Sequence, residues 1–195
     1  MKKLTIVLLF LCANIAVFGQ DTIRQKVNDA EKAELIKLLG LRQESFTCQF
    51  TEEKRIAVLD ETMVSKGVIV YEAPDELTCE YTEPESLVLT QGFKGDLSVK
   101  KNGKPIRASI MHRQMMEMMK AFISGKAVGK TNDYSVEVWS GEKDYKVVLA
   151  PTSPSRFSAI ELYLDKKDKR IAKTVLKEKR GDTTTITMTE QRVLN

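Results

Sequence analysis

The sequence has few of the residues that metal sites and enzyme active sites use. It contains one histidine, His112, which excludes a metal site with two histidine ligands. No Gly-x-Ser-x-Gly turn occurs, and no glycine-rich phosphate loop follows an expected strand. The sequence therefore predicts a protein that is not an enzyme and that uses no metal ion and no cofactor.

An excess of charge of one sign is also missing. The chain has 31 Lys and Arg residues against 27 Asp and Glu residues, a formal net charge of +4. The densest basic stretch, residues 166–180, is interrupted by Asp168 and Glu178 and alternates with apolar residues. This pattern is typical of the solvated face of a β-hairpin, so we expect no nucleic-acid partner.

No apolar run reaches the ~20 residues that a membrane-spanning helix needs. The longest run near the start, residues 4–11, follows Lys2 and Lys3 and precedes the small residues around Gly19. This pattern predicts a signal peptide over residues 1–19, cleaved after Gly19, and one domain over residues 20–195. Cys12 leaves a lipoprotein as the alternative, although a small residue is expected where the sequence has Leu11.

Cysteine is scarce after the expected cleavage, because only Cys48 and Cys79 remain. They fall on the first and third of four consecutive expected strands. Neighbouring strands lie ~4.8 Å apart, so the two residues would be separated by roughly twice that distance, beyond the ~7 Å limit for a disulfide. We expect two free thiols that pack as small apolar groups; a disulfide is the alternative if the sheet curls strongly.

The sequence is rich in short segments with strand patterns. Residues 45–92 hold four of them, and a fifth at 96–100 is joined to a short one by the hairpin signal Asn102-Gly103. Five more are expected at 134–139, 145–149, 157–164, 170–178 and 183–191. About eleven strands with few helices predict a mainly β (α+β) fold, built as a curved antiparallel sheet or an incomplete barrel.

Two segments have helical patterns, residues 22–39 and 109–124. The second is rich in methionine, and at 100° per residue one broad face of it carries Met111, Met115, Met118, Met119 and Phe122. Either this is a core helix in which Met fills gaps, or it is a lid over an apolar cavity, since unbranched Met side chains can repack around a ligand.

The order of these elements resembles the LolA family of periplasmic outer-membrane lipoprotein carriers. The resemblance covers most of the chain after residue 19. Its motifs are Phe46-Thr47-Cys48-Gln49-Phe50-Thr51-Glu52, Gly67, Pro74-x-x-Leu77-x-Cys79-x-Tyr81-x-x-Pro84, Gln91-Gly92, Ile160-x-Leu162-x-Leu164-Asp165 and residues 178–184.

The resemblance implies a half-open antiparallel β-barrel with a helical lid over a hydrophobic cavity. It implies a periplasmic carrier of a Gram-negative bacterium that binds the acyl chains of lipoproteins and shuttles them from the inner to the outer membrane. The partners would be acylated lipoproteins, an inner-membrane exporter and an outer-membrane acceptor, each contacted transiently by a monomer. A lipid-binding or envelope-sensing protein of the same fold is the alternative.

The expected cavity lining combines strand residues with the methionine face of the second helix. It consists of Phe46, Phe50, Val70, Leu89, Met111, Met115, Met118, Met119 and Phe122. The chain departs from the family pattern at Ala73, where the family often has an arginine thought to latch the lid, and at Cys79, where it has an aromatic residue. The resemblance therefore leaves open how the lid is held.

Overall fold

A computed structural model describes residues 24–40, 44–74, 76–123 and 133–194. The expected signal peptide, residues 1–19, lies outside the described residues. Neither helix in the described part of the chain is long and apolar enough to cross a membrane.

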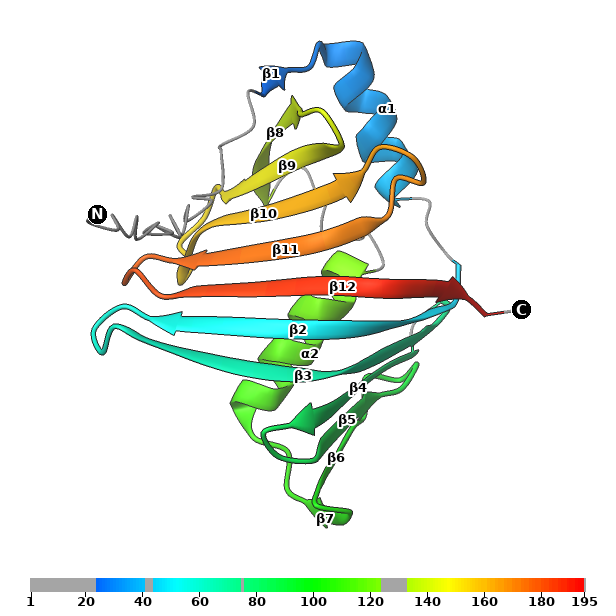
Figure 1. Ribbon diagram of the computed structural model, residues 1–195, viewed down its shortest axis with the longest axis vertical. Helices are drawn as coiled ribbons and strands as arrows, with labels where there is room; N and C mark the ends of the chain where they lie inside the picture. Colours follow the sequence, from blue (N-terminus) through cyan, green and yellow to red (C-terminus); the bar gives the residue numbers. More distant parts are fainter. Residues whose placement is uncertain (1–23, 41–43, 75, 124–132, 195) are drawn as a thin grey trace, which may run out of the picture.

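Within these described residues, twelve strands form one antiparallel sheet in the order β1-β8-β9-β10-β11-β12-β2-β3-β4-β5-β6-β7. The sheet is strongly curved and open at both edges (Figure 1). The strands are β1 Gln25–Lys26, β2 Phe46–Ile56, β3 Glu61–Glu72, β4 Glu76–Glu83, β5 Leu87–Gln91, β6 Leu97–Lys101, β7 Lys104–Ile106, β8 Tyr134–Ser140, β9 Asp144–Pro151, β10 Phe157–Asp165, β11 Ile171–Glu178 and β12 Thr183–Val193. The expected curved antiparallel sheet is confirmed.

Alternating side chains determine which face of the sheet is buried. In β2 and β3 the paired residues Cys48 and Ile69 are almost completely buried, whereas their strand neighbours Gln49 and Val68 are more exposed. Successive side chains on a strand point to opposite faces, so one face of the hairpin is apolar and the other is polar. The apolar face is the concave one, and most of the core lies there.

Strand β12 joins the two halves of the chain. It pairs with β11 on one side and with β2 on the other, so the strands expected at 157–191 continue directly into the meander that begins at Phe46. This pairing places Ile186 and Met188 on the concave face beside Phe50. A site on the concave face therefore draws residues from both ends of the sequence.

The first helix is shorter than the sequence predicts. Residues 22–39 were expected to be helical, but Gln25–Lys26 pairs with β8 as strand β1, and α1 spans Asp29–Gly40. The side chain of Asn28 explains this start, because its Oδ1 accepts a hydrogen bond from the Glu31 backbone N–H at 2.9 Å, as an N-cap residue does. The expectation of a helix at residues 24–28 is therefore wrong.

The two cysteines are both free and buried, as expected. Cys48 on β2 and Cys79 on β4 each pair with Ile69 of β3, so a whole strand separates them. Burial raises the pKa of the Cys48 thiol to about 12, and burial also raises the pKa of Cys79. Both groups are therefore protonated and unreactive at neutral pH while the fold is intact.

Candidate ligand-binding site

Helix α2, Ile110–Ile123, lies against the concave face of the sheet and crosses β12, β2 and β3 (Figure 1). Its methionine face points toward the strands. The Met119 sulfur lies 3.9 Å from the Cys79 sulfur of β4, and the Met115 sulfur lies 3.6 Å from the Tyr81 hydroxyl. Met116, which lies next to this face on the helix, is completely buried. The helix thus fills the hollow of the sheet with flexible side chains rather than covering its outside.

The filling under the middle of α2 is incomplete. A narrow hollow of about 20 Å³ lies between Met118, Met119 and Ile123 of the helix and the sheet. Its floor comes from three strands, β3, β11 and β12, and consists of Ile69, Thr174, Leu176, Ile186 and Met188. The hollow has room for one or two water molecules at most, and its walls are apolar except for Thr174.

A wider cleft of about 230 Å³ opens beside the first half of α2. Its inner wall is apolar and includes Met115, Met118 and Leu176. Its rim is polar and is formed by Glu52, Lys54, Gln114, Arg156, Glu178, Asp182 and Thr184, together with Met111. The cleft therefore has an apolar interior and a charged mouth, which suits an amphiphilic ligand whose hydrocarbon part points inward.

Tyr81 lies at the inner end of the polar rim. Its hydroxyl donates a hydrogen bond to Glu52 Oε2 at 2.8 Å, and its ring packs edge-on against Phe50 with centroids 5.0 Å apart. Burial raises the pKa of the Tyr81 hydroxyl, and the neighbouring Glu52 charge raises it further. Tyr81 is therefore a permanent neutral donor that holds the Glu52 carboxylate at the edge of the apolar region.

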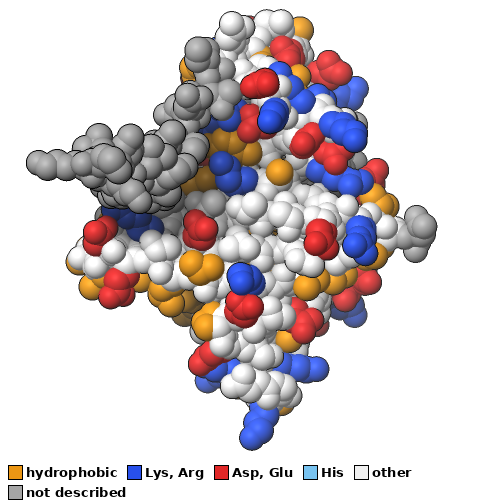
Figure 2. All heavy atoms as spheres, in the orientation of Figure 1, with side chains coloured by type: hydrophobic (Ala, Val, Ile, Leu, Met, Phe, Trp, Pro, Cys, Tyr) orange, Lys and Arg blue, Asp and Glu red, His pale blue; other side chains and the backbone are white. Residues whose placement is uncertain are grey.

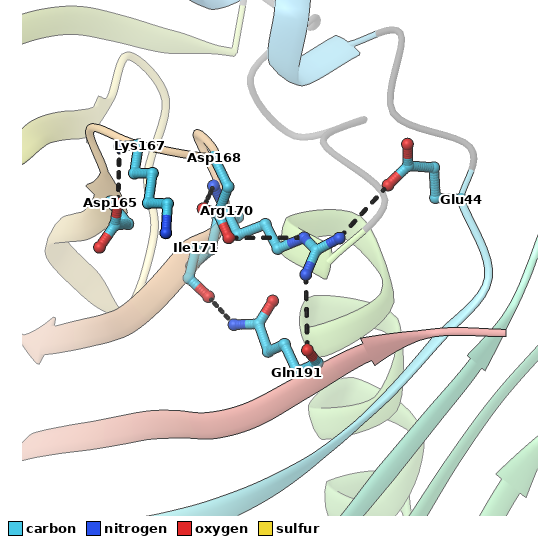
Figure 3. Close-up of polar contacts among 7 residues, drawn as sticks. All are labelled: Glu44, Asp165, Lys167, Asp168, Arg170, Ile171 and Gln191. Atoms are coloured by element: carbon cyan, nitrogen blue, oxygen red, sulfur yellow. Dashed lines mark hydrogen bonds and ion pairs between the residues drawn. The ribbon is translucent and has the colours of Figure 1, made fainter.

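The opposite end of α2 lies beside a second small hollow of about 30 Å³. Here β11 and β12 separate, since their pairing begins only at Lys173 and Thr187. Side chains bridge the gap: Gln191 Nε2 donates to the Ile171 carbonyl at 2.6 Å, and Arg170 Nη1 donates to the Gln191 carbonyl at 3.4 Å (Figure 3). These bonds close that end of the site.

Figure 3 also shows why Arg170 keeps this orientation. Its guanidinium lies 3.7 Å from the Asp168 carboxylate and 4.0 Å from that of Glu44, which precedes β2. The bulge in β12 between Thr189 and Arg192 leaves Gln191 outside the register with β2, so its carbonyl is available to Arg170. Nothing in the sequence pattern singles out this cluster.

The three hollows form one seam along α2. Met118 lines both the cleft and the narrow hollow, while Ile123 and Met188 line both the narrow hollow and the one at the far end. At 1.5 Å per helical residue, the seam from Met111 to Ile123 is about 18 Å long. An elongated apolar ligand that replaced part of the helix would therefore find a continuous apolar path.

Most of the expected lining residues lie on this face. Phe46 borders the far hollow, and the seam takes in Met111, Met115, Met118 and Met119. Phe50 and Leu89 are buried in the core and border none of the three hollows. The side chain of Phe122 lies outside the described part of the structure.

Val70 does not fit the expected lining. It pairs with Thr47 and Thr78, while the buried neighbours Ile69 and Tyr71 point to the concave face. Val70 therefore lies on the convex face, and Ile69 takes the place expected for it. The alternation that begins at Gly67 could have identified Ile69, because Gly67, Ile69 and Tyr71 share one face.

No cluster of three or more potential ligands for a metal ion occurs among the described residues. His112, the only histidine, lies at the first turn of α2, where its Nδ1 accepts a hydrogen bond from the Ser109 backbone N–H at 3.3 Å. This contact belongs to the start of the helix, and the seam does not include His112.

No protein-family model matches the chain, and no curated protein matches it in sequence. Among solved structures it is similar to MucB, at 14% identity and a TM-score of 0.55 over 86% of this chain and 60% of the MucB chain. It is also similar to the Pseudomonas aeruginosa MucA/MucB complex, at 14% identity and a TM-score of 0.50 over 85% of this chain and 58% of that one. A LolA superfamily protein from Nitrosomonas europaea is 13% identical, with a TM-score of 0.46 over 87% of this chain and 94% of that one.

At these identities the likeness shows the fold alone. The chain has the fold of MucB: a curved, open antiparallel sheet with a helix inside its concave face, which is the architecture that the sequence resemblance implied. It spans about 60% of the length of MucB.

Proposed function

We propose that this LolA-like protein binds the acyl chains of lipoproteins in the seam under α2 and carries them through the periplasm from the inner to the outer membrane. The observation that supports this most is the methionine face of α2, which lies on an apolar floor with unfilled space along its length. Flexible Met side chains can leave and refill such a space without breaking directional bonds.

The free-energy cost of exposing an acyl chain to water explains the need for such a site. At ~0.8 kcal/mol per CH₂, about fifteen methylenes cost roughly 12 kcal/mol to expose to water. The two smaller hollows, of about 20 and 30 Å³, are too small for such a chain. Binding therefore requires the methionine face to move off the sheet, and the ligand takes over contacts that α2 makes in the empty protein.

The polar rim of the cleft gives the ligand a direction. Glu52, Lys54 and Arg156 surround the mouth, whereas the path beyond Met118 is apolar. A hydrocarbon chain would enter methyl end first and leave its polar end at this rim. Such an arrangement holds the chain by burial alone, so the protein can release it to an environment that buries it better.

A second candidate is a sensor that recognises an envelope protein. The likeness to MucB, which has been solved in complex with MucA, favours this alternative. In that case the seam would hold a lipid or remain empty, and a partner protein would bind on the surface.

Replacement of Met115 and Met118 by Asp tests the site. Each carboxylate would have to be buried beside the ligand, so we expect binding of a palmitoylated peptide, measured by fluorescence anisotropy, to fall below detection. Ile106→Asp on β7 is the matched control, since Ile106 is exposed and lines none of the three hollows. Circular dichroism would verify that all variants fold. Undiminished binding by the double variant would disprove the site.

Mass spectrometry of molecules that copurify with the protein from its native envelope separates the two functions. Acylated protein supports the carrier. Free lipid supports a lipid-binding protein, and a partner protein without lipid supports the sensor.

A further inference from the structure

The β2–β3 hairpin ends in exposed apolar side chains. Val58 and Leu59 occupy its turn and are 87% and 59% exposed. Met63 and Val64 follow on β3 and are 55% and 48% exposed. Figure 2 shows apolar side chains at the left edge of the molecule, where the hairpin of Figure 1 ends. Exposed large apolar side chains gathered at one protruding point mark a surface that binds something.

This hairpin end stands at the mouth of the cleft. Met63 pairs with Lys54, which lines the cleft together with Met111 of α2. Met111 and its neighbour Ile110 are themselves 69% and 76% exposed. The mouth is thus flanked by apolar residues from two elements, the hairpin and the first turn of α2.

Basic residues surround these apolar ones. The turn at 179–182 lies beside the hairpin end, since the Ala57 backbone N–H donates to Asp182 Oδ1 at 2.9 Å. That turn carries the exposed cations Lys179 and Arg180, which make no ion pair with a described residue. The acid of the hairpin turn, Asp60, is paired with Arg55 at 2.9 Å.

The helical side of the mouth is basic as well. Arg107 and Arg113 are exposed, lie on either side of Ile110 and Met111 in the sequence, and make no ion pair with a described residue. Glu53 and Glu61 on the hairpin and Glu117 on α2 are exposed nearby carboxylates without such a pair, and Glu52 and Asp182 on the rim of the cleft also lack one. Glu52 and Asp182 are only partly exposed and accept hydrogen bonds from the Tyr81 hydroxyl and the Ala57 backbone N–H. Among the exposed groups, four cations therefore stand against three carboxylates.

We propose that this end of the molecule, Val58, Leu59, Met63, Ile110 and Met111 with the cations around them, docks on a bilayer that contains anionic lipid. Apolar side chains that project at separate points can enter the interface between headgroups and acyl chains, and the cations can contact lipid phosphates. A flat apolar face would instead suit a second copy or a protein partner. The inference extends the proposed function, because docking there would bring the cleft mouth to the membrane surface.

Vesicle flotation with the protein purified after expression of the full chain tests this. We expect binding to vesicles of phosphatidylethanolamine and phosphatidylglycerol, and weaker binding to phosphatidylcholine alone. Val58→Ser with Leu59→Ser should reduce the partition coefficient by about tenfold to a hundredfold, since each side chain would lose most of its burial in the bilayer. Phe93→Ser is the matched control, because Phe93 is 56% exposed and lies at the opposite ends of the strands.

Charge is tested separately. Lys179→Ser with Arg180→Ser should reduce binding to the anionic vesicles about 30-fold and leave binding to phosphatidylcholine unchanged, because each cation near an anionic surface strengthens binding about fivefold. Equal binding to both vesicle types by the unaltered protein would overturn the role of the cations.

The remaining outcomes are also decisive. Absence of vesicle binding, or equal binding by the Val58 and Leu59 double variant, would overturn the docking proposal. Palmitoylated-peptide binding measured on the same proteins reports on the seam independently. If the protein binds the peptide but not the vesicles, the docking proposal is wrong and the acyl site stands. If the protein binds the vesicles but not the peptide, the docking proposal stands and the acyl site is wrong.

Discussion

A covalent link between α2 and the sheet should prevent ligand binding. The Met119 sulfur lies 3.9 Å from the buried Cys79 sulfur, so Met119→Cys places a second thiol on the helix face opposite Cys79, one bond nearer the helix backbone than the Met sulfur. Cys79 is unreactive in the folded protein, so the link would be made by refolding the reduced chain under oxidising conditions, and it would then fix α2 in the position that fills the seam. Reduction would free it again, so one sample provides both states.

The size of the expected effect follows from what α2 buries. Met116 and Met119 are 0% and 4% exposed, and full burial of two Met side chains is worth about 3–6 kcal/mol, which a ligand must offset to lift the helix. The roughly 12 kcal/mol of one buried acyl chain exceeds this by about 6–9 kcal/mol. That surplus corresponds to dissociation constants of roughly 0.3 to 50 µM. The locked protein offers only the cleft and the two small hollows, without the space under α2 that joins them, so its affinity should fall by at least about 100-fold.

The assay is titration of a fluorescent palmitoylated peptide against the oxidised and the reduced protein. Peptide mapping by mass spectrometry verifies that residues 79 and 119 are linked. Cys79→Ala combined with Met119→Cys is the matched control, because it keeps the altered helix but cannot form the link. We expect loss of binding only in the oxidised Met119→Cys protein.

One result would refute the reasoning: tight binding by verified, fully oxidised Met119→Cys protein. The acyl chain would then occupy a place that α2 does not fill, and the seam would have no role. Loss of binding in the control as well would mean that residue 119 contacts the ligand directly, which the comparison of oxidised and reduced samples separates from locking.

Two further predictions concern the scaffold. In Gly67→Ala the new Cβ would collide with the Glu80 carbonyl oxygen across the β3–β4 bulge, so the free energy of unfolding in urea should fall by about 3 kcal/mol or more. An unchanged urea concentration at the unfolding midpoint would contradict the close approach of the Glu80 carbonyl to residue 67. Burial of Glu161 favours its protonated form, but hydrogen bonds from Lys177, Lys146 and Tyr163 outweigh that effect and hold its pKa below the usual 4.5. Because the pKa is lowered in the folded state, this carboxylate stabilises the protein above pH 4.5, and the contribution is lost as the pH falls through the folded-state pKa. Glu161→Gln should reduce stability by about 1 kcal/mol at pH 7 and by progressively less as the pH falls below 4.5, as thermal unfolding would measure.

Local patterns in the sequence determined most of the secondary structure. The strands around Phe46, Ile69 and Leu89 and the helix that contains Met115 follow from alternation of period two and from helical spacing, which act within a few residues. The hairpin at Asn102-Gly103 is confirmed, with both residues at positive φ. The predicted start of the first helix was wrong because β8, more than a hundred residues away, pairs with Gln25 and Lys26.

The candidate site was predicted on the helix and only partly on the sheet. Helical spacing put Met118 and Met119 on one face without reference to the rest of the chain. The floor of the seam depends on which strands are neighbours, and that depends on the pairing of β12 with β2. Leu176, Ile186 and Met188 were therefore missed, although each alternates correctly within its own strand.

The sequence by itself determined the strands, the methionine helix and the free cysteines, because these depend on contacts between near neighbours or on the distance across one strand. Only the tertiary structure decided that the helix lies inside the concave face, that Val70 points away from it, and that Arg170 and Gln191 close its far end. These depend on the curvature and register of the whole sheet, where one residue of shift turns every side chain to the other face.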